Sequence, residues 1–191
     1  MEPNLKPTFD GLFSDLCWLK VKWGEYEALF GTSKERIDRL NSAAGYFFGM
    51  IQQVMWEDSL LHLCRLTDPA GKGSRLRLTI RSLPDMCVGH AAHGEVVMRV
   101  GLALTAAGFA RDWRNRRIAH TDLRLAAGHQ GAEPLGPASR KDVISAISAI
   151  HNVLSCVAER VFAVTLAEEI EVPGERYSNA LLRAMERELG R

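Results

Sequence analysis

The chain has 191 residues and a formal net charge of +1, with 47% hydrophobic and 25% charged residues. This length suits one domain with a buried core, and the composition is ordinary for a globular protein. Because the net charge is so close to zero, a surface that is basic throughout is excluded, and any contact with nucleic acid has to come from a local patch.

The predicted elements are helices, which the spacing of apolar residues and the stop signals between them delimit. A first helix opens at Pro7-Thr8 and ends at Gly31. Thr32-Ser33-Lys34-Glu35 has the form of a capping box, and it begins a second helix that runs to Thr67 with a bend near residues 43–45. Asp68-Pro69 stops this helix.

Three further helical segments follow. We expect a short helix over residues 76–83 that Pro84 ends, and a long helix over about residues 92–121. Ser139 caps the next long helix, whose apolar stripe predicts a seam buried against the first or second long helix. The stripe consists of Val143, Ile147, Ile150, Leu154, Val157 and Val161. A charged helix over residues 176–189 completes the chain.

Strand signals are weak, so the fold class predicted from these elements is all-α, an antiparallel bundle of four to five main helices. We expect residues 1–170 to form the bundle and residues 171–191 to form a C-terminal helical appendage of the same domain. The N-terminus has no basic-then-apolar leader, and no run of eighteen apolar residues occurs. Four scattered cysteines without a C-x-x-C pair indicate reduced thiols. We therefore expect a cytoplasmic protein without a membrane span.

The segment from Arg111 to Asp122, "RDWRNRRIAHTD", concentrates the chemistry of the chain. It carries four arginines, an asparagine and a histidine within ten residues, and it gives residues 111–120 a charge of +3. An arginine grips phosphate with a planar, permanently charged fork, and a histidine can move a proton near neutral pH. These are the groups that can cut a phosphodiester without a metal.

The spacing within this motif leaves one assignment open. Arg114 and His120 are six residues apart, which is about 240° around an ideal helix, so they converge only if the helix bends, bulges or ends between them. Arg116 and Arg117 lie four and three residues before His120 and would share its face directly. The motif can also be explained without a functional site. It would then be a solvated basic helix end, in which the helix dipole alone favours His120.

Several sequence stretches together resemble the abortive-infection, AbiU-type family of the HEPN superfamily, over roughly residues 10–165. The resemblance rests on the Arg-Asn-x4-His motif at Arg114–His120, on LTDP at Leu66–Pro69 within "LCRLTDP", and on the stretch "LRLTIRSL" that follows. It also includes Trp23, Tyr26 and Phe30, "RIDRLN" at Arg36–Asn41, and "YFF" at Tyr46–Phe48.

This resemblance implies a HEPN-like helical bundle and metal-independent RNA cleavage that leaves a 2′,3′-cyclic phosphate. It implies that His120 acts as general base or acid, that Arg114 stabilises the phosphoryl charge, and that Asn115 is its companion. Since one histidine cannot easily make both proton transfers, a homodimer with two facing motifs is expected. Arg111, Arg116 and Arg117 are the candidates for RNA or phosphate binding.

Two other functions stay open beside the nuclease. A noncatalytic module that binds nucleotides or RNA, or a helical scaffold protein, would carry the same motif. A cognate antitoxin or a nucleotidyltransferase is a further expected partner, and no membrane partner is expected.

Other polar residues are weaker candidates. Asp58, His62 and Arg65 form one polar stripe that is either a structural ion-pair set or a second layer that orients the motif. Asp122 could orient His120. Asp68 is interpreted as a turn residue that ends the helix. For Trp113, burial in the core is preferred over stacking on a base. Metal ligation by Cys87, His90 and His93 stays open beside an incidental polar linker. We expect no cofactor and no metal.

Overall fold

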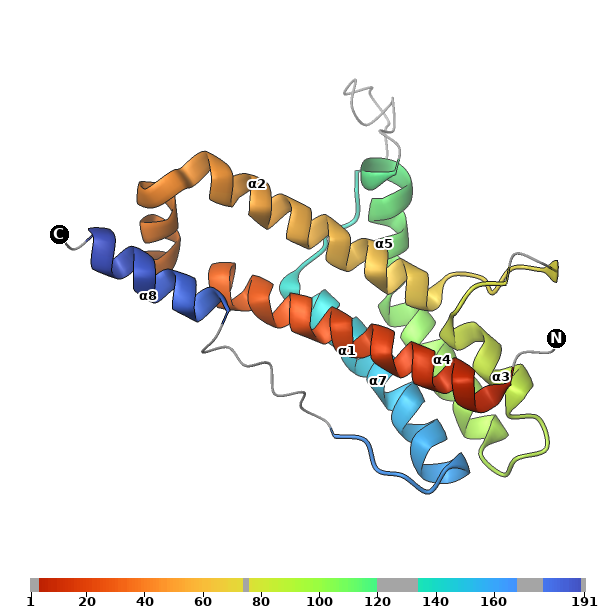
Figure 1. Ribbon diagram of the computed structural model, residues 1–191. Helices are drawn as coiled ribbons and strands as arrows, with labels where there is room; N and C mark the ends of the chain where they lie inside the picture. Colours follow the sequence, from red (N-terminus) through yellow and green to blue (C-terminus); the bar gives the residue numbers. More distant parts are fainter. Residues whose placement is uncertain (1–3, 74–75, 120–133, 168–176, 190–191) are drawn as a thin grey trace. The chain divides into compact units, whose positions relative to one another are not determined.

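A computed structural model describes residues 4–73, 76–119, 134–167 and 177–189, and every regular element in these ranges is a helix (Figure 1). The all-α class is therefore confirmed. In chain order the elements are α1 (Leu5–Phe30), α2 (Lys34–Thr67), the 3₁₀ turn η2 (Ile80–Ser82), α3 (Leu83–Met86), α4 (His93–Ala106), α5 (Gly108–Trp113), the π turn η3 (Arg114–Ile118), α7 (Arg140–Val161) and α8 (Ser178–Leu189).

The boundary between α1 and α2 lies where the sequence predicts it, but the cap of α2 is Ser33 and not Thr32, the first residue of the predicted capping box. The amide of Gly31 donates to the carbonyl of Glu27 at 2.8 Å and closes the last turn of α1. The Ser33 hydroxyl accepts from the amide of Arg36 at 3.2 Å and caps the start of α2. Within α2, Ala44 has φ −164° and ψ 66°, outside the helical region. The bend expected near residues 43–45 is thus confirmed, and Figure 1 shows it in the α2 ribbon.

Two predicted boundaries are wrong. Residues 76–79 precede a helix that starts only at Ile80, because Thr79 has extended backbone (φ −154°, ψ 148°) and caps η2. Pro84 then lies in the first turn of α3 and does not end a helix. A proline is tolerated there since the first-turn N–H has no intrahelical partner.

The long helix predicted over about residues 92–121 is divided within the described residues. α4 ends at Ala106, a turn at Ala107 leads into α5, and α5 continues as the π turn. In Figure 1 these pieces follow one another in green.

α7 begins with a complete capping box, because Ser139 and Asp142 each bond the other's backbone amide. Five of its six stripe residues are buried, and Val161 is partly exposed. The stripe helix packs against α4, a partner that the sequence analysis did not name. By length and composition α7 could cross a membrane, but 56% of its most apolar window is buried inside the structure, as in a core helix.

The chain forms two compact units, and α1 and α2 contribute to both. The first contains Met1–Leu16 and Leu60–Glu168, the second Cys17–Ser59 and Glu169–Arg191. In the first unit the core is aliphatic, with Leu12, Leu16, Leu63, Leu66, Leu83, Ile150 and Leu154 fully buried. This unit holds the whole motif as far as it is described. The expected division into residues 1–170 and 171–191 stays a prediction.

The second unit has an aromatic core. The rings of Trp23 and Tyr26 stack at 4.9 Å between centroids, and Trp56 lies about equally far from both, at 6.1 and 6.0 Å. α8 is anchored in this unit at its first residue, where the amide of Ser178 donates to the Glu25 carboxylate at 3.0 Å. Aromatic packing of this kind stabilises beyond its buried area by about 1 kcal/mol per pair.

Candidate functional site

The end of α2 is tied down by the segment before η2. The Thr79 hydroxyl lies 2.8 Å from the carbonyl of Asp68 and 3.0 Å from that of Leu66, so it can donate to either. The Arg81 Nε donates to the carbonyl of Thr67 at 2.7 Å. The last carbonyls of a helix have no intrahelical donor, and these side chains supply the missing bonds. The end of α2 is therefore a fixed platform.

Two arginines of the motif bind consecutive residues of this platform. Arg111 donates to the Thr67 hydroxyl at 3.2 Å and to the carbonyl of Leu104. Arg114 forms an ion pair with the Asp68 carboxylate and donates through Nε to Asn115 Oδ1 at 3.0 Å. The two motifs that carried the resemblance, LTDP and Arg-Asn-x4-His, thus form one network.

Arg114 keeps donors for a ligand. A guanidinium has five N–H donors, of which Nη1 faces Asp68 and Nε faces Asn115. Among the described residues, none accepts a hydrogen bond from Nη2. The side chain of Arg114 is 26% exposed, so part of it is in contact with solvent. A phosphate can bind there while Asp68 and Asn115 hold the plane of the guanidinium.

The Asp68 carboxylate depends on this pairing. Its Oδ1 is buried and accepts no hydrogen bond from the described residues, while Oδ2 faces Arg114. A buried carboxylate without a cation carries a large desolvation cost. One helical turn before Asp68, burial raises the pKa of the Cys64 thiol to about 11, although the positive charge of Arg114 acts to lower this pKa. Cys64 therefore stays a neutral thiol near neutral pH.

The spacing of Arg114 and His120 requires a bend, a bulge or a helix end between them, and the structure has a π turn at residues 114–118. The amide of Ala119 donates to the carbonyl of Arg114 at 2.8 Å, a bond from residue i+5 to residue i. Residues five apart, and not four apart, then lie over one another. His120 and Asp122 lie outside the described residues. The bulge is present, and the convergence of Arg114 with His120 stays a prediction.

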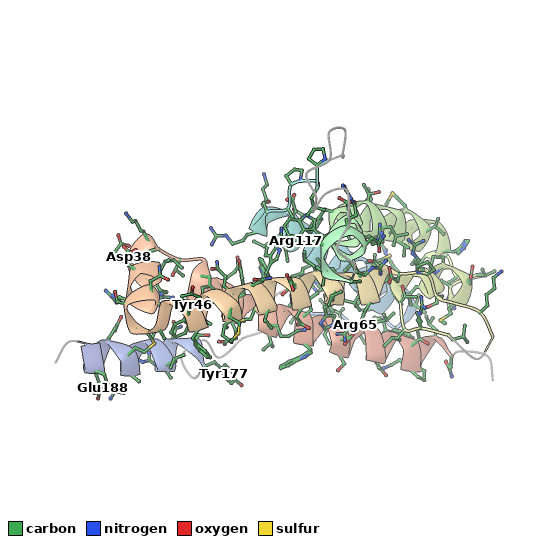
Figure 2. The ribbon with its side chains drawn as sticks, turned by 90° about the horizontal axis from the view of Figure 1, so that it is seen from above. Asp38, Tyr46, Arg65, Arg117, Tyr177 and Glu188 are labelled. Atoms are coloured by element: carbon green, nitrogen blue, oxygen red, sulfur yellow. The ribbon has the colours of Figure 1, made fainter. Side chains whose placement is uncertain are left out.

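The remaining motif arginines have different surroundings. Arg116 lies 3.6 Å from the Asp112 carboxylate and donates to the carbonyl of Pro134 at 3.3 Å. Arg117 is exposed, with its guanidinium carbon 5.5 Å from the centroid of the Trp113 ring. The guanidinium of Arg117 is thus the most open of the motif's four, and Figure 2 labels this residue.

Trp113 is neither a core residue nor a free stacking platform. It is partly exposed, and its Nε1 donates to the carbonyl of Gly136 at 2.9 Å. The expectation of a core tryptophan is wrong in this respect, because the indole N–H needs a partner at the surface of the bundle. Trp113 and Arg116 together hold residues 134–136 beside the motif.

The polar stripe of α2 does not form one ion-pair set. Asp58 pairs with Lys22 in the second unit. His62 is fully buried in the first unit, with Nε2 3.2 Å from the Asp15 carboxylate. Arg65 is exposed in the last turn of α2, where Figure 2 labels it. Asp58 and Arg65 form no hydrogen bond or ion pair with the motif residues that the structure describes.

Arg65 instead lines a cleft at the end of α2. The cleft has a volume of about 440 Å³, and its lining consists of Asp15, Arg65, Asp68, Arg77 and Leu78. Because Asp68 is also the partner of Arg114, the cleft adjoins the motif network. Asp15 and Arg77 were not singled out from the sequence, since no local pattern marks either residue.

No metal centre is formed by the described part of the chain, where no three His, Cys, Asp or Glu side chains are placed to hold an ion. Cys87 is buried, whereas His90 is exposed. The two side chains therefore face different environments, and the C-x2-H-x2-H spacing does not gather ligands here.

The role of Asp68 was missed by sequence reasoning, which took it for a turn residue. The signal was present in the LTDP motif, but a pairing across 46 residues cannot be read from local spacing.

Comparison with known proteins gives one match. The family model HEPN_AbiU2, described as AbiU2, matches residues 2–167. No curated protein and no solved structure matches significantly.

Proposed function

The chain belongs to the AbiU2 family of HEPN proteins, and on that premise we propose that it is a metal-independent endoribonuclease of abortive infection that acts as a cytoplasmic homodimer. The ribose 2′-hydroxyl attacks the adjacent phosphate, and the products are a 2′,3′-cyclic phosphate and a 5′-hydroxyl. His120 moves the proton, and Arg114 stabilises the charge on the phosphoryl oxygens.

One observation carries this proposal: Arg114 is held in place by Asp68 and Asn115, while its Nη2 donates to none of the residues that the structure describes. A positioned donor next to a developing negative charge is the usual source of transition-state stabilisation. Such positioning by two side chains is more than a solvated basic helix end needs. It supports a phosphate site at Arg114 with Asn115 as its companion.

The ion pair also favours the alternative, a noncatalytic module that binds nucleotides or RNA. Asp68 offsets part of the positive charge of Arg114, which weakens the stabilisation available to a transition state. A binding module tolerates that loss better than a nuclease does. A cognate antitoxin or nucleotidyltransferase remains a proposed partner in both cases.

Cleavage of RNA in the presence of EDTA separates the two functions. We expect 2′,3′-cyclic phosphate ends from the wild-type protein, and a rate lower by roughly 100-fold or more in His120→Ala. Arg114→Lys is expected to lose a similar factor, because a point ammonium cannot replace the planar fork. Arg117→Ala is the matched control, since it removes an exposed motif arginine and should keep the rate at saturating RNA.

Full activity of both His120→Ala and Arg114→Lys would exclude this mechanism. Binding of RNA without any cyclic-phosphate product would favour the noncatalytic module.

The homodimer is tested by light scattering. We expect a particle of about twice the 21.2 kDa of the chain at micromolar concentration, because two motifs have to share the proton transfers. α4, which leads into the motif, exposes Val97, Met98 and Leu102, and an apolar face of this kind suits a second copy. A 21 kDa particle that still cuts RNA would contradict the proposed dimer.

A further inference from the structure

The cleft at the end of α2 combines two carboxylates with two arginines, and these groups differ in whether they are already paired. Asp68 is paired with Arg114, and Asp15 lies 3.2 Å from His62 Nε2. Arg65 and Arg77 have no side-chain hydrogen bond or ion pair with any described residue. With Arg114 included, three arginines stand against the carboxylates of Asp15 and Asp68, so the net charge around the cleft is positive even when Asp15 counts as unpaired.

The position of Arg77 in the cleft wall is fixed by its backbone. Its amide donates to the carbonyl of Ala70 at 2.7 Å. Next to it, Leu78 lies so close to α1 that a Cβ at Gly11 would be 3.0 Å from Leu78 Cδ2. Thr79 then binds the end of α2. Arg65 is part of that same end of α2, so both arginines project from backbone that is held in place.

We propose that this cleft is a binding site for a phosphate ester, with Arg65 and Arg77 as the groups that bind the phosphate. Guanidinium forks match the oxygens of a phosphate, and two of them without partners in one cleft favour an anion over a neutral ligand. The volume of about 440 Å³ lies in the range of small-molecule sites and accommodates one nucleotide. The Asp15 carboxylate accepts a hydrogen bond from the sugar or the base.

The phosphate ester comes either from an RNA strand or from a free nucleotide. This inference deepens the proposed function, because a strand in the cleft passes the Asp68–Arg114 pair, and to that extent it rests on RNA being the substrate. Binding itself requires no cleavage, so the two ideas can fail separately.

The test measures binding of probes that cannot be cut, with EDTA present. A fully 2′-O-methylated RNA hexamer represents the strand, and adenosine 5′-monophosphate represents the free nucleotide. We expect Arg65→Ala and Arg77→Ala each to weaken binding of at least one probe by roughly 10-fold or more. Arg187→Ala is the matched control for loss of one positive charge, because Arg187 is exposed on α8 in the other unit.

A variant of similar size tests the charge of the cleft. Arg77→Gln keeps much of the length of the side chain and removes the charged fork, and we expect it to weaken binding of the same probe while circular dichroism stays helical. Unchanged binding in this variant would contradict the proposal.

The possible outcomes distinguish an RNA strand from a free nucleotide as the ligand, and they distinguish the cleft proposal from the nuclease proposal. Binding of the hexamer alone identifies a strand as the ligand, and equal binding of the monophosphate identifies a free nucleotide. Equal affinity of wild-type, Arg65→Ala and Arg77→Ala overturns the cleft proposal even if RNA is cut. No binding of either probe overturns it as well. Arginine-dependent binding of these probes, together with no cyclic-phosphate product from cleavable RNA in EDTA, leaves the cleft proposal standing and contradicts the nuclease.

Discussion

At position 114, a guanidinium that the motif assigns to phosphate also neutralises a half-buried carboxylate. The side chain of Asp68 is only 17% exposed, and its Oδ1 has no hydrogen-bond partner among the described residues. Loss of activity in an Arg114 variant can therefore have two causes, a missing phosphate donor or a strained end of α2. Stability measurements separate them.

We expect Arg114→Ala to lower the free energy of unfolding by about 1–3 kcal/mol, because it strands the Asp68 carboxylate without its cation. In that background, Asp68→Asn should recover part of the loss, since a neutral amide costs less to bury than a charge. Urea denaturation followed by circular dichroism measures both changes. Arg117→Ala, an exposed neighbour, should stay within about 0.5 kcal/mol of wild-type.

A double variant as unstable as Arg114→Ala alone would show that Asp68 is not the cause. The activity loss in Arg114→Lys could then be read directly as a loss at the phosphate, provided that this variant is as stable as wild-type.

Among the elements, α7 is organised by local signals and the motif helix is not. The capping box of α7 was predictable because Ser139 and Asp142 are three residues apart. The turn at Ala107 and the π turn at residues 114–118 have no such signal. A π turn is unfavourable in isolation, and packing at both ends, through Arg111 and through residues 134–136, accompanies it here.

Ser139→Ala is expected to lower the free energy of unfolding by about 1 kcal/mol, because it removes the side-chain cap of α7. Hydrogen bonds from Ser139 hold the pKa of the Asp142 carboxyl below its usual 3.8. Because the folded pKa is lowered, the contribution of Asp142 to stability is fully present above the usual pKa of 3.8. It is lost as the pH falls from there through the folded pKa.

The difference between wild-type and Ser139→Ala should thus narrow in acid. Thermal unfolding at pH 7 and at pH 3 measures it. Ser148→Ala is the control, since Ser148 is exposed within α7, where alanine only raises helix propensity. An equal loss in both variants would refute the cap.

For the whole molecule, a net charge of +1 limits how strongly RNA is attracted from a distance. Within the motif and the cleft, the arginines that we expect to meet a strand are Arg114, Arg117, Arg65 and Arg77. The described structure engages Arg111 with Thr67 and Arg116 with Pro134, and their contact with RNA stays a prediction. Binding should therefore be only moderately sensitive to salt.

We expect the logarithm of the RNA affinity to fall with the logarithm of the salt concentration at a slope of about −3, at roughly −0.7 for each of four phosphate contacts with a single strand. Arg117→Ala should reduce the steepness by about 0.7. Arg116→Ala should change it less, because Arg116 holds residues 134–136. Fluorescence anisotropy at several salt concentrations measures the slopes, and a larger effect of Arg116→Ala would reverse this assignment.

The sequence by itself determined the helical class, the family, the C-terminal end of α1 and the cap of α7, because these depend on apolar periodicity and on bonds between residues a few positions apart. It also marked Arg114 and Asn115. Only the tertiary structure decided that Asp68 is the partner of Arg114 and that Asp15 faces His62. Only there did Arg65 and Arg77 meet in one cleft. These pairs come from different elements, and their contact depends on how the helices pack, which no local pattern encodes.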